Sequence, residues 1–384
     1  MSTHQHIDRI CLAVLLCTIL LTVLFMNGAR LGIRVITDQE SGRSSACFSY
    51  NDRNDSWDYS HPTVIRLDQQ SVRGSGAYFY GTDLVIAESG YYHISGDLSE
   101  GRILVDAHSY SKVFILLTGV DLHCEEDACF QVRQAEKVFL NLAAGSENHF
   151  SGGKVWSDEA ISAGRDGVIF AGDDLTINGQ GSLTIEAPFR HGIEANDDLI
   201  ITGGTITVSA ATDAVNVNDS FRFAGADLSL TAGDDGVSVK TKDTGYFYME
   251  SGSVAIDAGD DGIHSAGNVT LAGGELTVTA VDDAVHADNI ITVTGGSLTV
   301  PHSYRGLEAA QIDLLGGTRD IGYGDEAIHL TGGTASQPEP EDIVETPEPV
   351  HEVEYTTGTW LWVGASFLVL ILGVALVKAF KKHG

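Results

Sequence analysis

Aspartates recur at a near-constant spacing through the middle of the sequence, and their carboxylates are the groups best suited to chemistry. If the repeated segments stack as strands about 4.8 Å apart, two carboxylates at that distance repel by roughly 3.5 kcal/mol at an effective dielectric of 20. A hard divalent cation offsets such repulsion, and Ca²⁺ takes about six to eight oxygen ligands from carboxylates and carbonyls. The sequence therefore predicts calcium binding by Asp213, Asp234, Asp235, Asp260, Asp261, Asp282 and Asp283.

A structural role is the alternative interpretation of these aspartates. Asp side chains at exposed turns also accept hydrogen bonds from local backbone N–H groups, and spacing alone does not separate that role from metal binding. No cysteine and no dense group of histidines accompanies the acidic column, so a site for a softer metal is not predicted there. Cys124 and Cys129 bracket a short bend elsewhere and could form a local disulfide in an exported chain.

The acids belong to a repeat that covers much of the chain. Copies begin at residues 166, 191, 213, 235, 261, 283, 305 and 326, at intervals of 25, 22, 22, 26, 22, 22 and 21 residues. Within a copy, apolar residues alternate with small polar ones, which is the period of a β-strand, and Gly-Gly pairs mark bends. A copy of about 22 residues with three short strands is typical of one coil of a parallel β-helix. We expect an all-β solenoid over residues 63–333.

The coil register predicts which side chains face outward. The residues two and four positions after the first residue of each copy, such as Ile263 and Ser265 after Asp261, should point inward. The residue three positions after it should point outward. The outward column then contains Glu194, Asn216, Ser238, His264, His286, Glu308 and His329.

Sugar contacts are expected from polar side chains of this column and from exposed tyrosines, whose rings join a large apolar body to a polar group. The alternative for the tyrosines is that they cover the core beneath an insertion at residues 240–245. The predicted carbohydrate-binding residues are Glu194, His264, His286, Tyr246, Tyr248 and Tyr304.

The order of the segments GYYHISGDLSEGRILVDA, KVFILLTGVDLHCEEDACFQV, KVFLNLAAGSENHFSGG and DDLTINGQGSLTIEA, followed by the DDG-I/V repeats, resembles the carbohydrate-binding-domain family of microbial surface proteins. The resemblance covers about residues 63–333. It implies a right-handed parallel β-helix similar to pectate lyases, with binding of calcium and of polysaccharides such as cellulose and pectic polymers, and no lyase activity. His191 and Arg305 replace the acid of the coil-start motif, which is present at Asp166, Asp213, Asp235, Asp261 and Asp283.

The regions outside the repeat suggest export and membrane attachment. Residues 1–29 contain an uncharged run and are predicted to be a signal peptide or an N-terminal membrane anchor, and residues 30–62 a linker or N-terminal cap. Residues 334–358 are rich in Pro and Glu and should form an extended stalk. Residues 359–377 are predicted to be a transmembrane helix, and residues 378–384 a basic cytoplasmic tail. The solenoid would then lie outside the cell membrane.

The net charge of −31 argues against nucleic acid and anionic membrane surfaces as partners. The favoured function is a membrane-tethered module that binds an extracellular polysaccharide with the help of Ca²⁺ and is not an enzyme. One alternative is a calcium-dependent lyase of the pectate type, in which Arg165, Arg190 or Arg305 removes a proton from a uronate. A structural surface or adhesion protein without a glycan ligand is the other.

Overall fold

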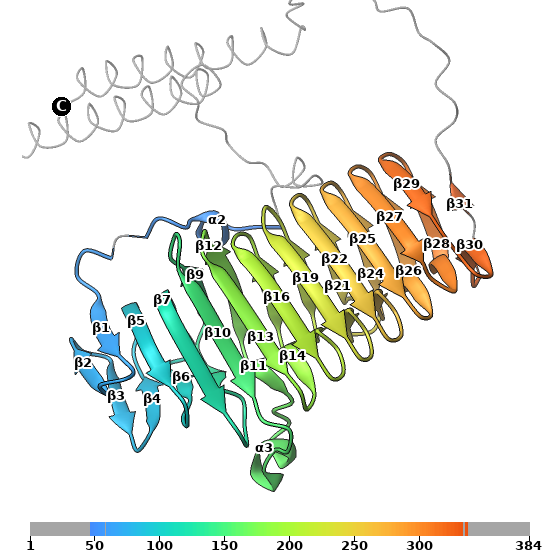
Figure 1. Ribbon diagram of the computed structural model, residues 1–384. Coiled ribbons are helices and arrows are strands. Elements are labelled where there is room, and N and C mark those ends of the chain that lie inside the picture. The colour runs from blue at the N-terminus through green and yellow to red at the C-terminus, as the bar shows by residue number, and fades with distance from the viewer. Residues whose placement is uncertain (1–46, 58, 333–334, 337–384) are drawn as a thin grey trace, which may run out of the picture. The chain divides into compact units, whose positions relative to one another are not determined.

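The computed structural model describes residues 47–57, 59–332 and 335–336. These residues form a β-solenoid of about 11 turns, and Figure 1 shows its strands stacked as successive rungs from β1 to β30. The predicted all-β class is confirmed, because the helices of the described residues are only α2 (Tyr50–Arg53) and α3 (Asp158–Ser162).

The flanking hydrophobic helices expected from the sequence, at residues 1–29 and 359–377, fall outside the described residues, as do the stalk and the basic tail. Within the described ranges, none of the helices has the length and hydropathy needed to cross a membrane.

The strands form three parallel sheets, named faces A, B and C, that follow one another along each coil. Face A consists of β4 (Asp83–Ile86), β6 (Ile103–Asp106), β8 (Phe130–Gln134), β11 (Gly167–Ala171), β14 (His191–Ala195), β17 (Val215–Val217), β20 (Val237–Val239), β23 (Ile263–Ser265), the first parts of β26 (Asp283–Val293) and β28 (Arg305–Leu314), and β30 (Glu326–Leu330).

The second and third sheets complete each coil. Face B consists of β1 (Thr63–Arg66), the first parts of β5 (Gly90–Leu98) and β7 (Lys112–Cys124), β9 (Lys137–Leu142), β12 (Asp174–Gly179), β15 (Asp198–Ile201), β18 (Ser220–Phe223), β21 (Tyr246–Met249), β24 (Asn268–Leu271), the second parts of β26 and β28, and β31 (Ala335–Ser336). Face C consists of the second parts of β5 and β7, β10 (Glu147–Gly152), β13 (Ser182–Ala187), β16 (Thr205–Ala210), β19 (Asp227–Ala232), β22 (Ser253–Ala258), β25 (Glu275–Ala280), β27 (Ser297–His302) and β29 (Thr318–Ile321). The short strands β2 (Ser71–Arg73) and β3 (Ala77–Tyr80) pair antiparallel with β1 and β4.

The predicted inward positions form the core. Val215, Val237, Ile263 and Val285 pair in register from coil to coil, and each is 0% exposed. Burying an aliphatic side chain of this size contributes about 1.5–3 kcal/mol, and the contribution repeats at every coil. The alternation read from the sequence therefore fixes which side of each strand is buried.

The predicted outward column is also in register. The pairings run from Glu194 through Asn216, Ser238, His264, His286 and Glu308 to His329. Asn216, Ser238 and Glu308 are nevertheless buried. Two of these three side chains contact the first residue of their own copy, since Asn216 donates to the carboxylate of Asp213 and Glu308 accepts from Arg305.

Glycine pairs make the bends, as the sequence predicts. Gly274 has a φ of +85°, a region that L side chains rarely adopt. A Cβ added to Gly273 would lie 2.3 Å from the carbonyl oxygen of Glu250 in the preceding coil. Stacked bends at this separation therefore leave no room for a side chain.

Residues 47–57, called the strap, lie along face B. Phe48 packs against Tyr248 on β21 with ring centroids 6.0 Å apart, and Trp57 packs against Phe114 on β7 at 4.5 Å. Helix α2 begins after a capping box at Ser49, where Asp52 is the third helical residue. The segment for which the sequence suggested a linker or an end cap thus covers the outer side of a sheet.

Candidate functional site

The acidic stripe is defined as Asp213, Asp234, Asp235, Asp260, Asp261, Asp282 and Asp283, and it lies where the chain enters face A. The aspartates at the first positions of the copies form a ladder between coils. The N–H of Asp235 donates to Oδ1 of Asp213 at 3.3 Å, that of Asp261 to Asp235 at 3.2 Å, and that of Asp283 to Asp261 at 2.9 Å. All four side chains are buried, at 2–8% exposure.

This ladder gives the buried aspartates a structural role. Each of Asp213, Asp235 and Asp261 uses one carboxylate oxygen to satisfy a backbone N–H of the next coil, and a buried N–H without a partner is costly. The backbone role considered as the alternative from the sequence therefore applies to one oxygen of each carboxylate, although the N–H belongs to the next coil and not to the local turn. Calcium binding by the remaining oxygens stays a prediction.

The neighbouring aspartates of the stripe extend it to the surface. Asp234, Asp260 and Asp282 are exposed. Carboxylate oxygens of Asp234, Asp235 and Asp260 lie within 4.8 Å of one another, and so do those of Asp260, Asp261 and Asp282. Five of the seven predicted metal ligands are thus brought into two clusters that share Asp260, while Asp213 and Asp283 belong to neither.

Like charge is concentrated in the stripe. Partial burial, followed by the charges of neighbouring acids, raises the pKa of Asp234 and of Asp260. Burial also raises the pKa of Asp213. These donor groups are hard oxygens with unfavourable mutual repulsion, so they fit a hard cation such as Ca²⁺.

The carboxyl groups of Asp283 and Glu308 interact at the C-terminal end of the stripe. Burial and the charges of Asp261 and Glu308 raise the pKa of Asp283 to about 7. Burial opposes ionisation of Glu308 as well, but its hydrogen bond with Asp283 and the charge of Arg305 lower its pKa. Oδ1 of Asp283 is buried and accepts no hydrogen bond from the described residues. The closeness of the two carboxyl groups thus opposes ionisation of Asp283.

Two of the predicted carbohydrate-binding residues, His264 and His286, lie together beside the stripe. Their rings stack with centroids 4.8 Å apart and 17° between planes. Nδ1 of His264 is 3.5 Å from Asp235, and Nδ1 of His286 is 3.4 Å from Asp261. The hydrogen bond with Asp235 raises the pKa of His264, and the one with Asp261 raises that of His286. The outward column read from the sequence predicted that these two histidines, 22 residues apart, would be neighbours, and their pairing in register confirms it.

Glu194, also predicted to bind sugar, is engaged with the backbone. Its Oε2 accepts the N–H groups of Asp166 and Gly167 at 2.7 and 3.1 Å. Burial raises its pKa to about 7. The carboxylate therefore holds the start of β11 to β14, in the same way as the buried aspartates hold later coils.

The predicted tyrosines lie in different places. Tyr248 points away from the core, as expected, but it is only 8% exposed because Phe48 of the strap covers its ring. Phe48 thus covers the ring that was predicted to contact a sugar, and sugar binding by Tyr248 stays a prediction. Tyr246 packs against the same cluster on face B. Tyr304 is 46% exposed at the edge of face A, and Arg305 lies 5.3 Å from its ring centroid.

The three arginines considered as catalytic bases all contact carboxylates. Arg165 binds Asp127 through Nε and Nη2 at 2.8 and 2.9 Å, Arg190 binds Asp166 at 2.6 Å, and Arg305 binds Glu308. A carboxylate partner stabilises the protonated guanidinium. None of the three guanidinium groups is therefore suited to act as a catalytic base.

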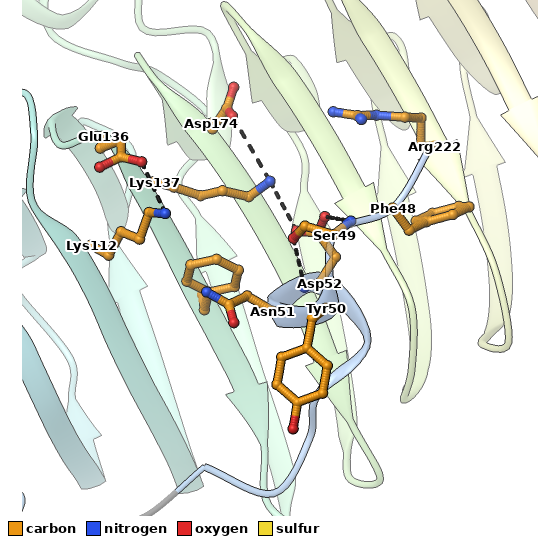
Figure 2. A pocket seen from close by; sticks show the side chains of 11 residues that line it. Phe48, Ser49, Tyr50, Asn51, Asp52, Lys112, Glu136, Lys137, Asp174 and Arg222 are labelled. Atoms are coloured by element: carbon orange, nitrogen blue, oxygen red, sulfur yellow. Dashed lines mark hydrogen bonds and ion pairs between the residues drawn. The ribbon is translucent and has the colours of Figure 1, made fainter. Parts of the chain in front are cut away.

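A cavity of about 540 Å³ lies between the strap and face B and was missed by sequence reasoning. Figure 2 shows Lys137 at its centre, between Asp52 at 2.9 Å and Asp174 at 3.8 Å. Lys112 contacts Glu136 at 3.0 Å on one side. The cavity depends on contacts between residues 48–52 and strands far along the chain, and no local sequence pattern marks such contacts. Cys124 and Cys129 are buried free thiols, so the local disulfide considered from the sequence is not formed in this structure.

Comparisons with known proteins agree with this architecture. A solved structure titled "polysaccharide lyase-like protein from C. thermocellum, Gadolinium derivative" superposes with a TM-score of 0.54 at 24% identity, covering 72% of this chain and 97% of that one. The fold is thus that of polysaccharide-lyase-like β-solenoids. A carbohydrate-binding domain-containing protein of Acetivibrio thermocellus is 36% identical over 129 residues, which are 33% of this chain and 45% of that protein.

The family model described as "Carbohydrate-binding domain-containing protein" matches residues 80–332. The chain belongs to this carbohydrate-binding-domain family, as the segment order in the sequence indicated.

Proposed function

We propose that the solenoid is an extracellular, calcium-assisted polysaccharide-binding module. The observation that carries this proposal is the pair of three-carboxylate clusters that share Asp260 at the surface of face A. Buried Asp235 and Asp261 are held by the backbone ladder, so the clusters are built on rigid rungs, which favours a defined cation site.

In this proposal Asp234, Asp235, Asp260, Asp261 and Asp282 hold Ca²⁺, with Asp213 and Asp283 at the two ends of the backbone ladder. A Ca²⁺ ion with remaining coordination positions binds the carboxylates of an acidic glycan. His264, His286 and Tyr304 border the stripe and are partly exposed, so they are placed to contact sugar hydroxyls and ring faces beside it.

The surrounding segments fit a tethered module. We propose that residues 359–377 anchor the chain in the cell membrane, that residues 334–358 hold the solenoid away from it, and that residues 1–29 direct export or form a second anchor. The uncharged run in the first of these segments and the Pro- and Glu-rich composition of the second support this arrangement.

Binding is favoured over lyase activity because Arg165, Arg190 and Arg305 each contact a carboxylate. A lyase would need one of these guanidinium groups to lose its proton. Incubation with polygalacturonate and Ca²⁺ should therefore give no ultraviolet-absorbing unsaturated product, and a steady accumulation of that product would refute the binding proposal in its present form.

A glycan array tests the ligand class. The full-length chain should bind acidic polysaccharides with Ca²⁺ and lose this signal in a chelator. Asp260→Ala should lose it too, since Asp260 belongs to both clusters. Asp257→Ala is the matched control, an exposed aspartate on β22 of face C, and should bind normally. Equal binding with and without Ca²⁺, or by both variants, would contradict the proposal.

A further inference from the structure

The stacked histidines of face A form a metal-ligating group of a different kind from the acidic clusters. Ligand atoms of His264, His286 and Asp288 lie within 4.8 Å of one another. His264 and His286 are directly paired in register on β23 and β26, and Asp288 follows two residues later on β26. Nε2 of His286 is 3.8 Å from Oδ1 of Asp288. Two imidazoles and one carboxylate are thus presented together at the surface.

Buried carboxylates orient both imidazoles. Nδ1 of His264 faces Oδ2 of Asp235, and Nδ1 of His286 faces Oδ2 of Asp261. In each case the other oxygen of the same carboxylate accepts a backbone N–H from the next coil. Histidines that bind metals usually donate the second ring nitrogen to a carboxylate, which fixes the tautomer and leaves the first nitrogen as the ligand. Here both rings have this support.

We propose that His264, His286 and Asp288 form a site for a divalent cation of the zinc class, bound through Nε2 of both histidines and a carboxylate oxygen of Asp288. Imidazole nitrogen suits Zn²⁺, Ni²⁺ and Cu²⁺, whereas Ca²⁺ and Mg²⁺ take oxygen ligands. Two histidines and one carboxylate with a fourth position open is a known zinc ligand set.

The geometry requires a small adjustment on binding. Ligand atoms on a tetrahedral zinc lie about 3.3 Å apart for metal–ligand distances of about 2.0–2.1 Å, which is shorter than the spacing in this structure. Rotation of the two rings about their Cβ–Cγ bonds would close the gap. The side chains of His264, His286 and Asp288 are 37%, 26% and 44% exposed, so the rings have room to turn and the fourth position faces solvent.

A purely structural role would make a different prediction. If the histidines served only to neutralise Asp235 and Asp261, they would need Nδ1 but neither Nε2 nor Asp288. The position of Asp288 beside Nε2 of His286 is therefore the contact that separates the two roles. The inference does not depend on glycan binding. Its three ligand atoms are not those of the proposed calcium clusters, and the two sites share only the carboxylates of Asp235 and Asp261, which orient the histidines.

Calorimetric titration of the full-length, untagged chain with Zn²⁺, in buffer with saturating Ca²⁺, tests the proposal. One equivalent of Zn²⁺ should bind. His264→Asn and His286→Asn should each abolish uptake, and Asp288→Asn should weaken binding by about tenfold or more, the scale typical of lesions around metal sites. His329→Asn is the matched control, because His329 lies in the same outward column and also contacts an acid three residues earlier, Glu326.

Uptake that persists in the His264→Asn and His286→Asn variants, or the absence of Zn²⁺ uptake by the native chain, would overturn the proposal. Asp288 is exposed, so Asp288→Asn should leave the fold intact and a binding defect in this variant reports on the site. Circular dichroism shows whether the two histidine variants are folded. Ca²⁺ titration of the same variants distinguishes the two proposals. A variant that loses Zn²⁺ uptake but keeps Ca²⁺ uptake has lost the histidine site alone. A variant that loses Ca²⁺ uptake but keeps Zn²⁺ uptake has lost the acidic clusters alone.

Discussion

The carboxylate of Asp261 accepts the backbone N–H of Asp283 at 2.9 Å, across 22 residues of sequence. The same contact joins Asp235 to Asp261 and Asp213 to Asp235. A residue type that looks like a metal ligand in the sequence is thus also a connector between coils. The backbone uses only one oxygen of each carboxylate, and the second oxygen of Asp235 and of Asp261 faces a histidine. A further role in metal binding is compatible with these contacts because each carboxylate oxygen has two lone pairs.

Removing this connector should destabilise the solenoid. Asp261→Ala leaves the buried N–H of Asp283 without its acceptor, which costs about 1–3 kcal/mol, so the free energy of unfolding should fall by about that amount in urea titrations without Ca²⁺. Asp261→Asn should lose less, because its amide oxygen still accepts the bond. Asp257→Ala, on the exposed side of face C, should change stability little. Equal losses for Asp261→Ala and Asp257→Ala would show that the ladder contributes nothing.

Stability without Ca²⁺ should depend on pH through Asp283. Its pKa is about 7 in the folded chain, above its ordinary value of about 3.9, so the folded state binds the proton more tightly than the unfolded state. The contribution is therefore fully present below about pH 4 and is lost as pH rises through about 7. The raised pKa values of His264 and His286 act in the same direction.

The comparison of native chain with Asp283→Asn isolates this residue. The native chain should lose stability between about pH 5 and pH 8, and the variant should lose less, since Asn does not ionise. Thermal unfolding at several pH values measures both curves. Parallel curves for the two proteins would be inconsistent with a raised pKa at Asp283.

The strap should detach when its buried ion pair is broken. Asp52 is 2% exposed, lies 2.9 Å from Lys137 and accepts a hydrogen bond from Thr176. Asp52→Ala leaves Lys137 without its closest partner, and breaking a buried pair costs about 3–5 kcal/mol. Trp57 would then leave Phe114, and its fluorescence should shift towards that of a solvent-exposed indole.

Lys112→Ala is the control for the strap, because the Lys112–Glu136 pair is about half exposed and such pairs contribute about 0–1 kcal/mol. Its fluorescence should match that of the native chain. If Asp52→Ala also left the spectrum unchanged, the aromatic contacts of Phe48 and Trp57 would be sufficient to hold the strap.

The sequence predicted the solenoid well because its coils repeat. A nearly constant interval between copies places Glu194, Asn216, Ser238 and His264 in one register, and the structure confirms that column. Period-two alternation likewise identified the buried face of each strand. Both signals are local or periodic, so they can be read without knowing any contact.

Contacts between distant segments were not predictable in this way. Alternation placed Tyr248 on the outside of its strand, but it carried no information about Phe48, which covers Tyr248 from 200 residues earlier. The sequence pattern likewise carried no information about the backbone of the next coil, which approaches the first aspartates of the copies closely enough to bury them. The register placed His264 beside His286, but it carried no information about the orientation of their rings, which stack on each other.

Calcium uptake by the acidic stripe is the central claim, and calorimetric titration of the full-length chain with Ca²⁺ tests it most directly. The native chain should take up Ca²⁺, Asp260→Ala should take up less because it removes a carboxylate from both clusters, and Asp257→Ala should behave as the native chain. A native chain that takes up no Ca²⁺, or uptake that Asp260→Ala leaves unchanged, would contradict the account.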